Sequence, residues 1–236
     1  MNSEAYIRTN DLSRHYHRGP SVVRALDGVS IAIGHGEFLG IVGSSGSGKT
    51  TLLNLLAGLD TPTSGTVEIG GVPLSSLSRR QLSAYRAKRV GMIFQSFNLI
   101  SHCTALQNVE AALYFNGTTP RERRSLSTAV LEQLGLADRL LHRPADLSGG
   151  EQQRVAVARA IVKKPEILFA DEPTGNLDYE NAIQIISLLA GLNRDGLTIV
   201  LVTHNLELAK DRTSRVIRMQ YGHVVQETAP LHGGRR

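Results

Sequence analysis

The sequence contains little of what defines several large classes of protein. Its 236 residues include one cysteine, Cys103, and no tryptophan, and aromatic residues make up only 5%. A single cysteine cannot form an intrachain disulfide or a cysteine-rich zinc site, which excludes disulfide frameworks and zinc ribbons. The longest apolar stretch, 52–59, is broken by Asn54 and is far shorter than the ~18 to 20 residues of a membrane-spanning helix. We therefore expect any membrane role to come through a partner.

The beginning of the chain also lacks the apolar segment of a secretory signal, because Glu4, Arg8 and Asp11 interrupt it. What is present is an ordinary globular composition, with 41% hydrophobic and 20% charged residues. The formal net charge of +5 is compatible with nucleic acid, an anionic membrane surface or a phosphate-bearing ligand, and does not decide among them. We expect a cytoplasmic protein with one domain over residues 1–232 and a disordered tail over 233–236.

Four short apolar runs give the framework of the fold. They cover residues 38–42, 90–94, 167–170 and 197–202, and each is bounded by polar or turn residues. Continuous apolar runs of this length are typical of strands buried on both faces, and helical segments between them indicate a mostly parallel sheet. The predicted class is therefore α/β, with a mostly parallel sheet.

Two further parts complete the predicted architecture. Short runs at 7–12, 29–33 and 67–69 predict a small antiparallel layer, and 216–225 resembles a hairpin. A helical subdomain is predicted over about 96–160, inserted in the core, with helices at 105–114, 120–134 and 151–162.

A residue suited to ligand binding or catalysis follows each of the four apolar runs. After the first run this residue is a glycine that opens a glycine-rich loop, and after the other three it is polar. These groups are Gly43, Gln95, the pair Asp171 and Glu172, and Thr203 with His204. In a parallel sheet the carboxyl ends of the strands fall on one edge, and open α/β folds bind their ligands there. The sequence therefore predicts one site built from widely separated segments.

The first of these groups opens a phosphate-binding motif. The segment Gly43, Ser44, Ser45, Gly46, Ser47, Gly48, Lys49, Thr50 matches G-x-x-x-x-G-K-[ST], between a predicted strand and a helix. The loop N–H groups and the helix N-terminus form an anion site, Lys49 is expected to reach the β- and γ-phosphates, and the Thr50 hydroxyl is expected to ligate Mg²⁺.

The two adjacent acids suggest a division of roles. Successive side chains diverge at a strand end. Asp171 is therefore predicted to hold Mg²⁺ while Glu172 polarises a water in line with the γ-phosphate.

A second glycine-rich segment predicts a helix start. Ser148 and Glu151 have the spacing of a capping box, with Gly149 and Gly150 between them. The glycines also expose N–H groups at a positive helix end, so one chain holds a second phosphate-binding terminus. The simplest arrangement is a head-to-tail dimer in which Ser148 and Gly150 of one subunit close on the γ-phosphate bound by the other.

Together these motifs resemble those of ATP-binding-cassette (ABC) transporter ATPases. The resemblance covers nearly the whole chain and includes the order of the phosphate loop, Gln95, LSGGEQQR at 147–154, the segment 171–178 and His204. Residues 94–99 and 171–178 resemble the branch associated with macrolide export and lipoprotein release. The segment Ser101, His102, Cys103 departs from the Pro-x-Leu common in that branch.

The resemblance implies roles for further residues. Tyr16 corresponds to the aromatic that stacks on adenine, and Thr51 lies beside the phosphate loop. Gln95 would contact Mg²⁺ or the attacking water, His204 would bind the γ-phosphate and hold the water with Glu172, and Asp178 would line the dimer seam.

The implied function is an ATPase subunit that binds ATP and Mg²⁺, forms a homodimer and drives an integral membrane permease. A groove near Gln95, Phe97 and Leu99 is expected to receive a short helix of that permease. A mechanical signal relay without transport is the alternative within the branch. A soluble cassette acting on DNA or ribosomes is less favoured, because the long coiled coil or second cassette of such proteins is absent, and no nucleic acid partner is expected.

Overall fold

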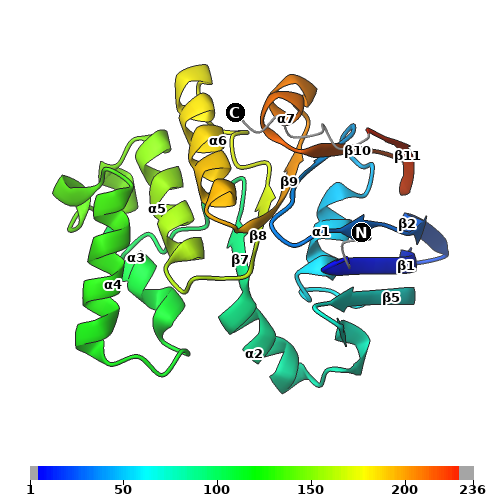
Figure 1. Ribbon diagram of the computed structural model, residues 1–236, viewed down its shortest axis with the longest axis horizontal. Coiled ribbons are helices and arrows are strands. Elements are labelled where there is room, and N and C mark those ends of the chain that lie inside the picture. The colour runs from blue at the N-terminus through cyan, green and yellow to red at the C-terminus, as the bar shows by residue number, and fades with distance from the viewer. Residues whose placement is uncertain (1–4, 229–236) are drawn as a thin grey trace.

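Two sheets of different character organise the structure, a computed structural model that describes residues 5–228 (Figure 1). The larger sheet has the strand order β11-β10-β4-β9-β8-β7, and its strands are parallel except for β11, which pairs antiparallel with β10 at one edge. Its strands are β4 (Phe38–Val42), β7 (Val90–Ile93), β8 (Ile167–Asp171), β9 (Thr198–Thr203), β10 (Arg215–Gln220) and β11 (His223–Glu227). The four predicted strands and the hairpin are confirmed, with bounds that differ by two residues at most.

The second sheet is the predicted antiparallel layer. It contains β1 (Ile7–Arg18), β2 (Ser21–Val29), β3 (Ala32–Ile33), β5 (Ser64–Ile69) and β6 (Val72–Pro73). The prediction of one strand over 29–33 is wrong. The side chain of Thr9 donates to the carbonyl of Val29 and accepts from the N–H of Ile31. These bonds take up the backbone groups around Ser30, so the chain pairs with β1 in two separate strands, β2 and β3.

The main core lies between the two sheets, where α1 (Lys49–Leu56) buries its leucines. Alternation along each parallel strand divides the side chains between two faces. In β8, Ile167 and Phe169 join this core, whereas Leu168 and Ala170 belong to the core on the opposite face. This double burial explains why the strands are continuous apolar runs.

On the opposite face the sheet is covered by α5 (Gly149–Ile161) and α6 (Tyr179–Arg194) (Figure 1). Val157 and Ala160 of α5 pack there together with Ile186 and Leu189 of α6. A smaller cluster joins β4 and β10 to α7 (Leu206–Arg212). The parallel strands are thereby fixed by packing on both faces.

The helical insert has a core of its own. It contains α3 (Ala105–Glu110), α4 (Pro120–Gln133) and short 3₁₀ turns at Ala111–Leu113, Ala137–Arg139 and Pro144–Asp146. The predicted helices 105–114, 120–134 and 151–162 are found as α3 with its following turn, α4 and α5. Val155 and Ala158 of α5 pack in the insert core while Val157 packs on the sheet, so α5 connects the two parts.

Two features of the remaining chain complete the description of the fold. The basic run at 79–89 forms α2 (Arg79–Arg89), preceded by a 3₁₀ turn at Leu74–Ser76 and capped by Ser78. Within residues 5–228, no helix combines the length and apolar character needed to cross a bilayer. The tail 233–236 lies outside the described residues.

Candidate functional site

The phosphate-loop residues connect the end of β4 to the start of α1. Gly48 has a φ of 99°, and a Cβ there would lie 2.3 Å from the carbonyl oxygen of Ala25, so only glycine fits. The Lys49 side chain is nearly buried, and its Nζ donates to the carbonyl oxygens of Gly43 and Ser44, both at 2.9 Å. The loop therefore bends around its own lysine.

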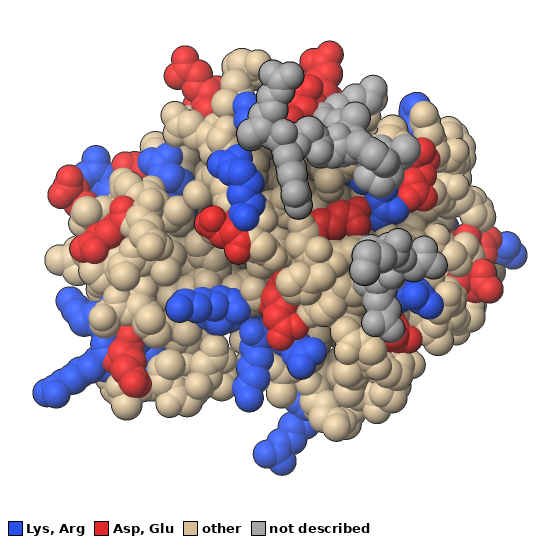
Figure 2. Space-filling model, viewed as in Figure 1, with Lys and Arg blue, Asp and Glu red and all other residues tan. Residues whose placement is uncertain are grey.

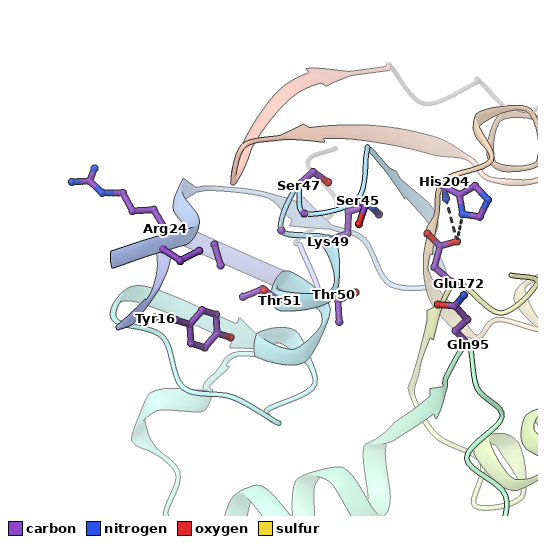
Figure 3. Close-up of a pocket in the computed structure, with 14 residues that line it drawn as sticks. Tyr16, Arg24, Ser45, Ser47, Lys49, Thr50, Thr51, Gln95, Glu172 and His204 are labelled. Carbon is purple, nitrogen blue, oxygen red and sulfur yellow. Dashed lines mark hydrogen bonds and ion pairs between the residues drawn. The ribbon is translucent and has the colours of Figure 1, made fainter. Parts of the chain in front are cut away.

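A cavity of about 580 Å³ opens beside this loop (Figure 3). Eleven of the predicted site residues line it: Tyr16, Ser45, Gly46, Ser47, Gly48, Lys49, Thr50, Thr51, Gln95, Glu172 and His204. In Figure 3 Tyr16 lies on one side of the loop and Glu172, His204 and Gln95 lie on the other. The cavity thus joins segments that are far apart in the sequence, as the shared sheet edge predicts.

Asp171 and Thr50 meet at the base of the site. The Thr50 hydroxyl donates to Oδ1 of Asp171 at 3.2 Å. Burial raises the pKa of Asp171 and Glu172 adds to this effect, while the Thr50 hydrogen bond and Lys49 oppose it. Carboxylate and hydroxyl oxygens are hard ligands of the kind that Mg²⁺ prefers, so this pair fits the cation.

Glu172 turns away from Asp171 because its backbone is left-handed, with a φ of 47°. Its N–H donates to the carbonyl of Val202 at 2.9 Å, which holds the strained residue against β9. Its Oε2 lies 2.9 Å from Nδ1 of His204 and accepts the backbone N–H of the same histidine at 3.2 Å. A carboxylate fixed in this way can orient and deprotonate a water.

Gln95 is fixed by the chain that follows β8. The side-chain amide of Asn176 donates to the carbonyl oxygen of Gln95 at 2.9 Å. A Cβ on Gly175 would lie 2.9 Å from Nε2 of Gln95, so the glutamine side chain rests directly on this glycine. The position of Gln95 is therefore tied to the segment that leads to Asp178.

The segment predicted to close on a second nucleotide lies elsewhere. The capping box at the start of α5 is confirmed: Ser148 Oγ accepts from the N–H of Glu151 at 3.2 Å, and Oε2 of Glu151 accepts from the N–H of Ser148 at 2.8 Å. Arg139 also donates to Glu151, at 2.8 Å. The Ser148 N–H and Arg139 together lower the pKa of Glu151 to about 2. None of Ser148, Gly149, Gly150 and Glu151 lines the cavity.

The structure adds a packing reason for Gly150 that the sequence analysis lacked. A Cβ there would lie 2.1 Å from Oδ1 of Asn181. Asn181 in turn donates to Asp178, which caps α6. Asp178 and the start of α5 therefore form one contiguous surface outside the cavity.

Part of the cavity lining was not predicted from the sequence. Val23, Arg24 and Ala25 of β2 border the cavity next to Tyr16. Their strand exposes Val22 and Val23 to solvent, so it has no buried apolar run that would predict it. The segment before Leu26 does not alternate between apolar and polar residues, and the β-branched pair Val22 and Val23 is its main sequence signal for a strand.

Comparisons with a family model, with related proteins and with solved structures all point to the same family. The family model described as ABC transporter matches residues 26–175. The ABC transporter ATP-binding protein MJ1508 of Methanocaldococcus jannaschii is 46% identical over 220 residues, which cover 93% of this chain and 98% of that protein. YbbA of Escherichia coli, also called an ABC transporter ATP-binding protein, is 46% identical, with 96% of this chain and 100% of that one covered.

Another relative, the macrolide export ATP-binding/permease protein MacB of Hyphomonas neptunium, has a name that includes a permease as well as ATP binding. It is 46% identical over 94% of this chain, which spans 34% of MacB. Among solved structures, the ATP-binding cassette MJ0796 in a dimeric post-hydrolysis state bound to ADP and Pi has a TM-score of 0.88 at 39% identity. That match covers 96% of this chain and 99% of the other.

Proposed function

The chain belongs to the ABC transporter family as an ATP-binding subunit that hydrolyses ATP, and from this premise we propose that two copies close head to tail on two MgATP molecules to drive a separate membrane subunit. The observation that carries the proposal is the separation of the site into two surfaces. The cavity holds the phosphate loop, Gln95, Glu172 and His204, while Ser148 and Asp178 lie outside it. A second copy is the simplest source of the missing side.

Within one copy we assign the roles as follows. Lys49 and the loop N–H groups bind the phosphates, and Tyr16 stacks on the base. Thr50 and Asp171, with Gln95 in the same cavity lining as Thr50, would hold Mg²⁺, which when bound would offset phosphate charge. Glu172 takes a proton from the attacking water, and His204 holds Glu172 through the 2.9 Å contact between Nδ1 and Oε2.

The substitution Glu172→Gln tests the proposal. Loss of the carboxylate that accepts the proton is expected to lower ATP turnover about 10²- to 10⁴-fold, whereas MgATP binding persists because the amide keeps the shape of the side chain. Light scattering is expected to show a dimer with MgATP and a monomer with ATP plus a chelator of Mg²⁺. A protein that stays monomeric in saturating MgATP would contradict the head-to-tail arrangement.

The membrane subunit is proposed to bind a groove of about 310 Å³ between α2, α5 and the end of β7. It is lined by Ala57, Leu59, Arg86, Val90, Met92, Phe94, Asn98, Ala112, Arg159, Ala160 and Lys163. The groove lies beside the expected residues: Phe94 and Asn98 line it, whereas Gln95, Phe97 and Leu99 do not. Left-handed backbone at Phe97 and Asn98 turns the chain, so that Leu99 packs against the core of the insert instead.

Three cations of this groove determine what it would bind. Arg86 donates to the carbonyl of Gly58 and Lys163 to the carbonyl of Arg86, while Arg159 donates to two carbonyls of the segment after Gln95. Within the described part of the chain, none of the three pairs with a carboxylate. Burial lowers the pKa of Lys163 to about 8. Lys and Arg side chains also gather over α2 on the face shown in Figure 2.

We therefore propose an apolar partner helix that carries acidic residues. The substitution Lys163→Glu is expected to abolish copurification of a membrane protein while basal ATPase activity remains. The adjacent Lys164, which is exposed and does not line the groove, gives the matched control Lys164→Glu, expected to behave as wild type.

The relatives support a transport role without fixing the cargo. MJ1508 and YbbA are ATP-binding proteins matched over nearly their full lengths, and MacB combines ATP-binding and permease parts in its name. We propose an export or lipoprotein-release system at the cytoplasmic face of a membrane. If a membrane protein copurifies but no substrate crosses in reconstituted vesicles, the signal-relay alternative is favoured; if none copurifies, the soluble-cassette alternative is favoured.

A further inference from the structure

The ring of Tyr16 is held by Arg14 and Asp60, neither of which lines the cavity. The guanidinium carbon of Arg14 lies over the ring, 4.5 Å from its centre. The Tyr16 hydroxyl donates to Oδ2 of Asp60 at 2.7 Å. Arg14 closes the triangle, because its Nε donates to the same Oδ2 at 2.9 Å and its Nη2 lies 2.8 Å from Oδ1.

Asp60 connects this triangle to the phosphate loop. It lies in the turn after α1, and its N–H donates to the carbonyl of Asn54 within that helix. Its carboxylate also accepts the N–H of Thr61 at 2.7 Å. Burial acts to raise the pKa of Asp60, but the hydrogen bonds from Tyr16, Thr61 and Arg14 outweigh it, so the pKa is lowered and the group stays charged. The helix whose N-terminus carries the phosphate site thus also holds the ring of Tyr16.

An aromatic ring has two faces, and Arg14 covers one of them. Tyr16 lines the nucleotide cavity, so its other face is available to a base. We propose that Arg14 and Asp60 are positioning residues that hold Tyr16 as a rigid stacking platform for the base of ATP, an inference that rests on the nucleotide-binding role proposed above. Because the ring is already ordered in the free protein, stacking loses less conformational entropy than it would on a free side chain.

The test compares a ligand that has a base with one that has none. Dissociation constants are measured by calorimetry for MgATP and for magnesium tripolyphosphate, on wild type, Arg14→Met and Asp60→Asn. Both variants are expected to weaken ATP about 3- to 5-fold, the size of one stacking contact, and to leave tripolyphosphate unchanged. A structural defect of the phosphate loop would weaken both ligands equally.

Arg24 provides the matched control. It lines the same cavity but pairs with Asp27, and in Figure 3 its side chain extends away from Tyr16. Any effect of Arg24→Met is expected to be shared by ATP and tripolyphosphate, because it would act through charge. Circular dichroism and thermal unfolding of each variant check that the fold is retained.

A double-mutant cycle completes the experiment. Tyr16→Ala alone is expected to weaken ATP about fivefold, and adding Arg14→Met to it is expected to change nothing further, because the ring that Arg14 holds is gone. Additive losses, equal losses for both ligands, or wild-type ATP affinity in Arg14→Met would overturn the inference while leaving the proposed function in place. A wild-type protein that binds tripolyphosphate but not ATP would overturn both.

Discussion

Two helices of this chain begin at glycine-rich segments, and their N-termini are completed in opposite ways. α1 follows Gly48, which has left-handed backbone and offers no side-chain cap, and no acidic residue lies in its first turn. α5 follows Ser148, which forms a capping box with Glu151. A helix N-terminus leaves up to four N–H groups unsatisfied, so α1 presents its donors to a ligand whereas α5 satisfies two of its own.

Because of this difference, the start of α1 is suited to binding a ligand and the start of α5 contributes to the stability of the fold. The start of α5 is stabilised within the chain, by Ser148, Glu151 and Arg139, before any nucleotide arrives. The start of α1 is arranged around the Lys49 ammonium, and a bound anion would stabilise it by mass action. Substitutions at the start of α1 should therefore alter nucleotide affinity. Substitutions at the start of α5 should alter stability and dimer formation.

The largest expected effect is at the uncapped terminus. Lys49→Ala removes a cation that we place on two phosphates. Charge-assisted hydrogen bonds contribute ~1.5 to 3 kcal/mol each, so we expect MgATP to bind about 100-fold more weakly. Calorimetry measures this, with thermal unfolding in the absence of nucleotide as the control. Unchanged affinity would place the phosphates elsewhere.

At the capped terminus, Ser148→Asp separates the two roles of the serine. Aspartate caps helices as well as serine does, so stability should be retained, but its charge would face the γ-phosphate of a second copy. We expect the ATP-dependent dimer to weaken at least tenfold while ATP affinity of the monomer is unchanged, measured by light scattering and calorimetry.

Ser148→Ala is the companion variant. It removes the cap and should cost ~1 kcal/mol of unfolding free energy, a loss that Ser148→Asp should not show. If the two variants dimerise equally well, the start of α5 does not meet a nucleotide.

The local motifs were predictable from sequence because each element carries its own signal. The buried strands β4, β7, β8 and β9 are continuous apolar runs, and the capping box at Ser148 needs only the spacing to Glu151. Sequence periodicity was also sufficient for α6, where Ala182, Ile185, Ile186 and Leu189 are buried on one face, although the sequence analysis did not assign it.

Contacts between distant segments could not be predicted in this way. Arg14 and Tyr16 meet Asp60 only because the antiparallel sheet packs on α1, and nothing near either segment indicates the pairing. The need for glycine at position 150 depends on Asn181 of another helix. Which residues around Gln95 face the groove also depends on the left-handed turn at Phe97 and Asn98. Asparagine often adopts this conformation, but phenylalanine rarely does, so the turn was not predicted.

The smallest expected effect also concerns the capped terminus and depends on pH. Because the pKa of Glu151 is lowered to about 2 in the folded chain, from ~4.3 when unfolded, its charge stabilises the fold at pH values above the unfolded pKa. This contribution is lost as the pH falls from about 5 to 2. Glu151→Gln keeps the capping geometry but removes the charge that Arg139 contacts. In urea titrations the variant should be less stable than wild type at pH 6, and the difference should shrink steadily towards pH 3; a difference that is constant with pH would show that the loss does not come from the charge of Glu151.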